Sequence, residues 1–228
     1  MEQLQSYADE RLVTSCVYCG HFTETRDHVP SRILLDEPYP QNLPVVPSCA
    51  ACNVGFSLDE EYLACLIDCV LAGSVEDVQR SKIKRILQQK PSLAAKLSQS
   101  RIIMLDGTIS FTIEHERVQN VALKLARGHA AFELSEPKRE GPSQVSCVPL
   151  TSLDEQSRSQ FETPPQVAVW PEVGSRAMQR LVVAQDEVCN GWINVQPGRY
   201  RYLASAQGSV LVRCVISEYL ACEVLWEA

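Results

Sequence analysis

Cys16-Val17-Tyr18-Cys19 and Cys49-Ala50-Ala51-Cys52 are two C-x-x-C pairs, and Arg26-Asp27-His28-Val29-Pro30 lies between them. The two residues inside each pair form a tight turn, so each pair can place two thiolates on one metal ion. We therefore predict one structural zinc ion bound by Cys16, Cys19, Cys49 and Cys52, with residues 20–48 forming a hairpin and its loop. The Asp27-His28 dipeptide inside this loop indicates that the zinc supports a second, catalytic site.

Disulfide bonds and buried free thiols are the alternatives to zinc. The first residues, Met1-Glu2-Gln3-Leu4-Gln5-Ser6, have neither a basic region nor an apolar region typical of a signal peptide. We therefore expect a cytoplasmic location, where thiolates stay reduced and can bind zinc. The longest apolar-rich run, residues 63–73, is interrupted by Asp68, so we expect no membrane span.

The net charge of −7 bears on the partners of the chain. An acidic chain repels a polyphosphate at long range, so any nucleic-acid binding must come from a local basic patch or from a partner. One basic cluster is formed by Arg80, Lys82, Lys84 and Arg85. It can be interpreted either as a phosphate-binding surface or as an ordinary solvated helix face.

The pattern along the chain predicts an α+β protein in four regions. Residues 1–61 form the zinc module, and residues 62–134 form a mainly helical region with a hairpin around Asp106-Gly107. Residues 135–165 are rich in Pro, Ser, Glu and Gln and predict a loop or linker. Residues 166–228 predict an antiparallel sheet, with strands at 166–170, 181–184, 192–195, 200–204, 210–216 and 221–226.

Several single residues in the helical region have competing interpretations. Ser57-Leu58-Asp59-Glu60 has the form of a capping box and predicts a helix that begins there. The carboxylates of residues 59–61 can then be charges at a helix N-terminus, additional metal ligands, or groups that repel phosphates. Cys65, Cys69 and His129 lie on apolar helical faces, and we interpret them as core residues.

The segment from about Cys16 to Glu61 resembles the HNH endonuclease family. The resemblance rests on the two C-x-x-C pairs, Asp27-His28, Asn42 in Gln41-Asn42-Leu43-Pro44, and Asn53 directly after Cys52. It implies a ββα-metal fold, which is a hairpin followed by a helix around a divalent cation. It also implies that Asn42 pins the loop and orients the histidine. The last position of the family motif is often histidine, so this chain would be a His-Asn-Asn version.

Phosphodiester hydrolysis needs an activated water and a cation that neutralises the developing charge. With an ordinary pKa near 6.5, His28 can accept a proton from water at neutral pH. Asp27 alternates to the other side of a strand, so its carboxylate could hold Mg²⁺ or Mn²⁺ together with the Asn53 carbonyl oxygen. The predicted catalytic residues are thus His28, Asp27, Asn42 and Asn53.

Two functions of different class follow. The first is a metal-dependent endonuclease with a one-metal mechanism, acting on DNA rather than RNA because the family mostly cuts DNA. The resemblance to bacterial HNH proteins also suggests defence against foreign DNA. The second is a catalytically inactive, zinc-stabilised module that binds nucleic acid or protein, with the C-terminal half recruiting a protein partner. His21 is an alternative zinc ligand, and His115-Glu116 lacks the second histidine of a zincin helix.

Overall fold

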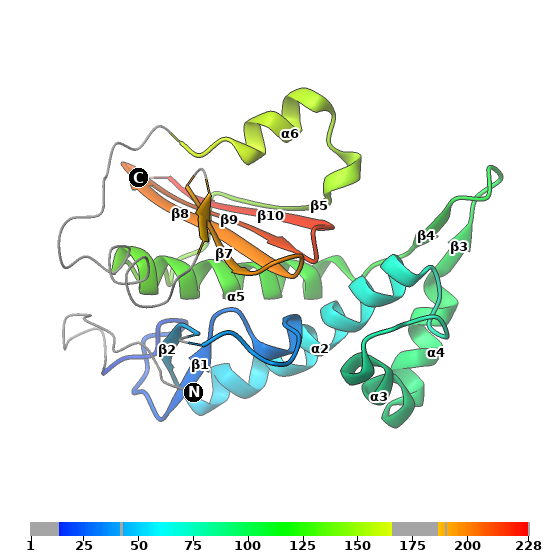
Figure 1. Ribbon diagram of the computed structural model, residues 1–228. Helices are drawn as coiled ribbons and strands as arrows, with labels where there is room; N and C mark the ends of the chain where they lie inside the picture. Colours follow the sequence, from blue (N-terminus) through cyan, green and yellow to red (C-terminus); the bar gives the residue numbers. More distant parts are fainter. Residues whose placement is uncertain (1–13, 42, 166–186, 190, 228) are drawn as a thin grey trace.

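The computed structural model describes residues 14–41, 43–165, 187–189 and 191–227 (Figure 1). The chain is an α+β protein with an antiparallel sheet in its C-terminal part, as predicted. This sheet has the order β5-β10-β9-β8-β7-β6. Its strands are β5 (Gln144–Pro149), β6 (Glu187–Cys189), β7 (Trp192–Gln196), β8 (Tyr200–Gln207), β9 (Ser209–Ile216) and β10 (Leu220–Trp226).

The N-terminal part contains β1 (Thr25–His28) and β2 (Val45–Ser48), which pair antiparallel, and the long helix α2 (Ala50–Ala72). Between the two strands lies the short 3-10 helix η1 (Arg32–Leu34). Helix α2 begins at Ala50 with Cys49 as its N-cap, so the predicted start at Ser57 was wrong. Ser57 lies inside the helix, where its hydroxyl donates to the Val54 carbonyl. Helix α2 also crosses residue 61, the predicted end of the first region.

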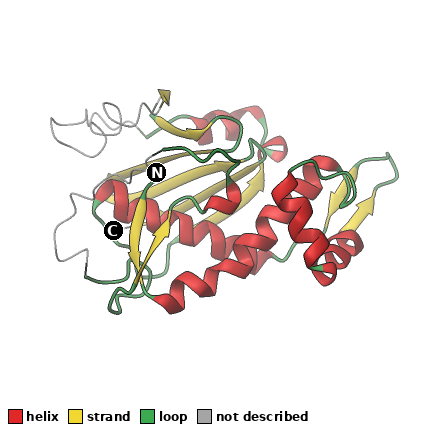
Figure 2. Cartoon of the chain, turned by 60° about the horizontal axis from the view of Figure 1, so that its bottom comes forward, coloured by secondary structure: helices red, strands yellow, loops and turns green. Residues whose placement is uncertain are grey.

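The middle of the chain contains α3 (Ser81–Gln89), α4 (Pro91–Ser100), the hairpin β3 (Arg101–Ile103) and β4 (Ile109–Phe111), and α5 (His115–Leu134). The predicted Asp106-Gly107 turn is confirmed, with Gly107 at a φ of 84°. Figure 2 shows α3, α4 and this hairpin at one end of the molecule, away from the large sheet. Five large apolar side chains of the hairpin are exposed: Ile102, Ile103, Met104, Leu105 and Ile109.

The segment predicted as a loop or linker, residues 135–165, contains strand β5, the 3-10 helix η2 (Leu150–Ser152) and helix α6 (Glu155–Glu162). Strand β5 forms an edge of the large sheet and pairs with β10. The predicted strands at 166–170 and 181–184 lie outside the described residues. The other four predicted strands are confirmed as β7 to β10.

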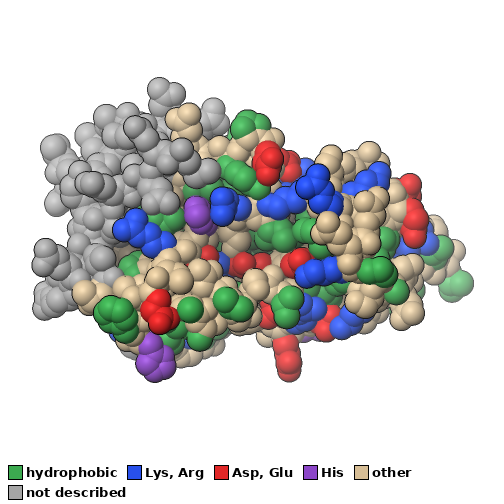
Figure 3. Space-filling view, turned by 90° about the horizontal axis from the view of Figure 1, so that it is seen from below, with side chains coloured by type: hydrophobic (Ala, Val, Ile, Leu, Met, Phe, Trp, Pro, Cys, Tyr) green, Lys and Arg blue, Asp and Glu red, His purple; other side chains and the backbone are tan. Residues whose placement is uncertain are grey.

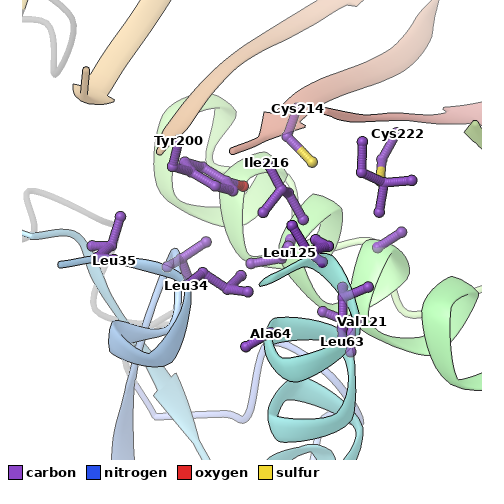
Figure 4. Packing of buried hydrophobic residues seen from close by; sticks show 14 of the residues in the cluster. Leu34, Leu35, Leu63, Ala64, Val121, Leu125, Tyr200, Cys214, Ile216 and Cys222 are labelled. Atoms are coloured by element: carbon purple, nitrogen blue, oxygen red, sulfur yellow. The ribbon is translucent and has the colours of Figure 1, made fainter. Parts of the chain in front are cut away.

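The large sheet is covered by helices on both of its faces. Side chains on one face of the sheet pack against α5, and those on the other face pack against α6, as alternation along a strand requires. Helix α5 in turn packs on α2 and on the β1–β2 pair (Figure 1). Figure 4 shows this junction, where side chains of the η1 segment, α2, α5 and the strands β8, β9 and β10 meet: Leu34, Leu35, Leu63, Ala64, Val121, Leu125, Tyr200, Cys214, Ile216 and Cys222.

The predicted core residues of the helices are confirmed. Cys65, Cys69 and His129 are each 0% exposed. The His129 Nε2 atom lies 2.8 Å from the Tyr200 hydroxyl, and its ring stacks on that of Tyr202. In the described part of the chain, no helix is long and apolar enough to cross a membrane.

Candidate metal centre and active site

The two C-x-x-C pairs meet in space. The sulfur atoms of Cys16, Cys19, Cys49 and Cys52 all lie within 4.8 Å of one another, and this cluster could hold a metal ion such as zinc. The Cys19 and Cys49 sulfurs are 3.6 Å apart. Four sulfurs bonded to one tetrahedral zinc at about 2.3 Å lie about 3.8 Å from each other. The observed spacing therefore suits a tetrahedral ion.

Each pair is shaped by local hydrogen bonds. In the first pair, the Gly20 amide donates to the Cys16 carbonyl at 2.8 Å, and Gly20 has a φ of 80°, which suits glycine. In the second, the Cys49 sulfur accepts from the Cys52 amide at 3.4 Å and caps α2. The cysteine cluster and the start of α2 are thus built by the same residues.

The four thiols cannot all ionise freely in this cluster. Burial raises the pKa of Cys16, but backbone amides of Cys49, Cys19 and Tyr18 outweigh it and lower that pKa to about 7. Burial, neighbouring cysteines and the charge on Cys16 raise the pKa of Cys52 far above its usual range. A bound cation would stabilise all four thiolates at once.

His21 lies at the rim of this cluster. Its Nδ1 atom is 3.3 Å from the Cys19 sulfur, and its side chain is exposed. The four cysteines already supply the ligands of a closed tetrahedral site, so His21 is a neighbour of the cluster.

His28 is the last residue of β1 and pairs with Val45 of β2. Its side chain is partly buried. Burial lowers the pKa of His28, and the charges of Arg32 and Lys124 lower it further, while Asp27 acts in the opposite direction. The imidazole is therefore neutral at pH 7, as a proton acceptor must be.

Asp27 has the opposite orientation and is 7% exposed. Its Oδ2 atom accepts a hydrogen bond from the Tyr18 hydroxyl at 2.8 Å and lies 2.8 Å from Nζ of Lys124 on α5. Burial, with the nearby Asp27 charge, raises the pKa of Tyr18. The tyrosine therefore stays protonated and donates to the carboxylate.

Lys124 joins Asp27 to a second carboxylate. Its ammonium group is 1% exposed and also contacts Glu60 of α2 and, at 2.7 Å, the Ser31 hydroxyl. Ser31 donates to Glu60 in turn. Sequence reasoning did not identify Lys124, although a single lysine among the apolar residues of α5 is an unusual feature.

The acidic run at residues 59–61 is also explained by these contacts. Asp59 pairs with Arg117 at 2.6 Å, Glu60 with Lys124, and Glu61 with Lys90 at 2.6 Å. Because α2 begins at Ala50, these residues are not charges at its N-terminus. All three carboxylates are instead paired with cations from later segments.

Asn53 lies in the first turn of α2, one residue after Cys52. Its amide nitrogen donates to the Thr25 hydroxyl at 3.2 Å and to the Arg26 carbonyl at 3.5 Å. Asn53 is thus held against β1. Its partner Thr25 lies two residues before Asp27 on that strand. Asn42, the fourth predicted catalytic residue, lies outside the described residues.

Comparison with known proteins adds no assignment to this geometry. No protein-family model, characterised protein or solved structure matches the chain.

Proposed function

We propose that this protein is an endonuclease of the HNH type, which hydrolyses phosphodiester bonds in nucleic acid, DNA rather than RNA. The observation that carries the proposal is the position of His28. Its neutral imidazole ends a strand that pairs with the strand leading directly into the Cys49-Cys52 pair. The pairing of β1 with β2 thereby holds a proton acceptor close to the four-cysteine cluster. Asn53 lies in the first turn of the helix that follows β2.

In this proposal the four cysteines bind a structural zinc ion. The segment between the two pairs packs Val29, Leu34 and Leu35 into the core, and the metal would hold its two ends together. The zinc thereby fixes the start of α2, and Asn53 with it.

His28 would accept the proton of the attacking water, and its partial burial would keep it neutral for that step. Asp27 and Asn53 could together hold a Mg²⁺ or Mn²⁺ ion. Within the described residues, the Tyr18 hydroxyl and Lys124 Nζ both contact Oδ2 of Asp27, so Oδ1 would be its oxygen for a cation. Mg²⁺ needs only one or two protein oxygens, because water and substrate phosphates complete its shell. Such an ion would neutralise charge that develops on the phosphate.

A plasmid-nicking assay with Mg²⁺ or Mn²⁺ tests the proposal. We expect His28→Ala to cut about 10²- to 10⁴-fold more slowly than the wild type, the usual loss for an acid–base group. His115→Ala is the matched control, because His115 is exposed at the start of α5. Equal cleavage by His28→Ala and the wild type would contradict the role of His28.

One observation favours a second function, a catalytically inactive module that binds a protein or nucleic-acid partner. The Lys124 ammonium already neutralises Asp27. A second cation at that carboxylate would be repelled by Lys124. If the wild-type protein cuts neither duplex DNA, single-stranded DNA nor RNA with any divalent metal, this second function replaces the first.

A further inference from the structure

Two cations and one aromatic ring form a small cluster next to His28. Lys82, in the first turn of α3, donates to the Tyr39 hydroxyl at 2.8 Å and to the Arg32 carbonyl at 3.2 Å. The Lys82 nitrogen lies 5.1 Å from the centre of the Tyr39 ring, and the Arg32 guanidinium carbon lies 5.8 Å from it. We call Arg32, Tyr39 and Lys82 the cation–tyrosine cluster.

The two cations are not neutralised by ion pairs. Among the described residues, no carboxylate lies within 4.0 Å of the charged groups of Arg32 or Lys82. Burial lowers the pKa of Lys82, and the positive charges of Arg80 and Arg32 lower it further, while Glu37 and Asp36 act in the opposite direction. Arg32 and Lys82 thus place two positive charges side by side in a chain whose net charge is −7.

Arg80, which the sequence grouped with Lys82, has a different role. It is held by Asp36 at 2.6 Å and Asp68 at 2.8 Å, and it also donates to two backbone carbonyls. Arg80 is thus a structural residue of the interior. Lys84 and Arg85 are exposed on α3.

The cluster lies beside the candidate active site. Arg32 follows His28 by four positions, and its charge acts on the His28 imidazole. Figure 3 shows the face seen from below, where Lys and Arg side chains form a row that includes a histidine. A polyanion that contacts Arg32 would therefore lie close to the His28 imidazole.

Two carboxylates, Asp36 and Glu37, oppose the cations, and Asp36 is itself paired with Arg80 and Arg199. The Tyr39 hydroxyl donates to Oε1 of Glu37 at 3.0 Å, and the Glu37 side chain is exposed. This group would repel a phosphate at the cluster. Removal of the Glu37 charge should therefore strengthen binding, whereas removal of a cation should weaken it.

We propose that Arg32, Tyr39 and Lys82 bind the backbone phosphates of a nucleic-acid strand that flank the phosphate at His28. This inference rests on the proposed function and names the surface that seats the substrate. Two cations and a hydroxyl group match the donors that contact phosphates without reading bases. The binding is therefore independent of base sequence.

The test is fluorescence anisotropy with a 30-base-pair DNA duplex and with one of its strands, over a range of salt concentrations. No divalent metal is added, so cleavage does not interfere. Each phosphate contact contributes about 0.9 to the slope of log K against log salt for a duplex, and about 0.7 for a single strand. We expect Arg32→Gln and Lys82→Gln each to weaken binding and to reduce the slope by about that amount. Glu37→Gln should tighten binding.

Arg158→Gln is the matched control. Arg158 is an exposed cation on α6, which lies across the large sheet from the N-terminal part (Figure 1). Arg158→Gln removes one positive charge, as Arg32→Gln and Lys82→Gln do. If the loss of any positive charge weakened binding, the salt slope of Arg158→Gln would change by the same amount. Unchanged slopes for Arg32→Gln and Lys82→Gln, an equal change for Arg158→Gln, or no binding by the wild type would each overturn the proposal. If binding depends on the cluster but the wild type cuts no substrate, the cluster stands and the nuclease proposal fails.

Discussion

The Lys124 ammonium group lies 2.8 Å from Oδ2 of Asp27, although the two residues are 97 positions apart in the chain (124 − 27). Their side chains are 1% and 9% exposed. Lys124 also contacts Glu60, so one buried cation serves carboxylates from β1 and α2. This arrangement has a direct consequence for stability.

We expect Lys124→Met to reduce the free energy of unfolding by about 3–5 kcal/mol, because it leaves two buried carboxylates without a cation. The measurement is urea denaturation of the variant and the wild type. Adding Glu60→Gln to Lys124→Met should recover part of the loss, since one unpaired charge is removed. An unchanged midpoint for Lys124→Met would show that the contacts of Lys124 do not stabilise the fold.

Cys49→Ser should abolish binding of one zinc ion per chain and lower the melting temperature, because the sulfur of Cys49 belongs to the four-cysteine cluster and also caps α2. Zinc content and a thermal melt measure both effects. Cys147→Ser is the matched control, since Cys147 lies on β5 outside the four-cysteine cluster. Full zinc content with an unchanged melt in Cys49→Ser would rule out the zinc site.

Asn53→Ala should raise the concentration of Mg²⁺ needed for half-maximal cleavage, because it deletes a proposed oxygen ligand and keeps His28. At saturating Mg²⁺ the rate should approach that of the wild type. A metal titration of the nicking rate measures this. A reduced rate at saturating metal with an unchanged requirement would mean that Asn53 has another role, such as holding β1 through Thr25.

Gly128→Ala on α5 should destabilise the protein. An added Cβ would lie 2.5 Å from a methyl group of Val29, just after β1. Overpacking costs about 1–3 kcal/mol, which exceeds the gain of about 0.8–1.0 kcal/mol from replacing glycine in a helix. Denaturant titration measures the difference, and Val29→Ala should relieve it in the double variant.

Gly55→Ala on α2 is the control for that substitution. A Cβ at Gly55 would meet no atom within 4 Å. We expect this variant to gain about 0.5–1 kcal/mol of stability. Equal effects at the two glycines would show that Val29 does not constrain α5.

The sequence predicted those features that depend on neighbouring residues. The C-x-x-C spacing predicted the cysteine cluster, Asp106-Gly107 predicted a turn, and alternation predicted four C-terminal strands. Local patterns could not show that Lys124 reaches Asp27, because such a contact depends on how α5 packs on β1. For the same reason, Arg80 could be assigned to a basic surface although it is buried between Asp36 and Asp68.

Two errors had local causes. Ser57-Leu58-Asp59-Glu60 has the composition of a helix start, but Cys49 provides an earlier cap through its sulfur. Strand β5 lies within a stretch rich in Pro and Ser, and its pairing with β10 forms a sheet edge that composition does not reveal. In both cases a specific cap or a tertiary contact outweighed local propensity.

Helix α2 carries Cys52 and Asn53 in its first turn and core residues such as Leu63 and Cys69 further along, before it ends at Gly73. A genetic exchange that joined another protein at residue 61 would divide this helix and separate Lys124 from Asp27. A recombination junction beyond Gly73 would keep the helix whole but would still remove Lys124. Transfer of the cysteine module without α5 would therefore leave Asp27 and Glu60 without their buried cation.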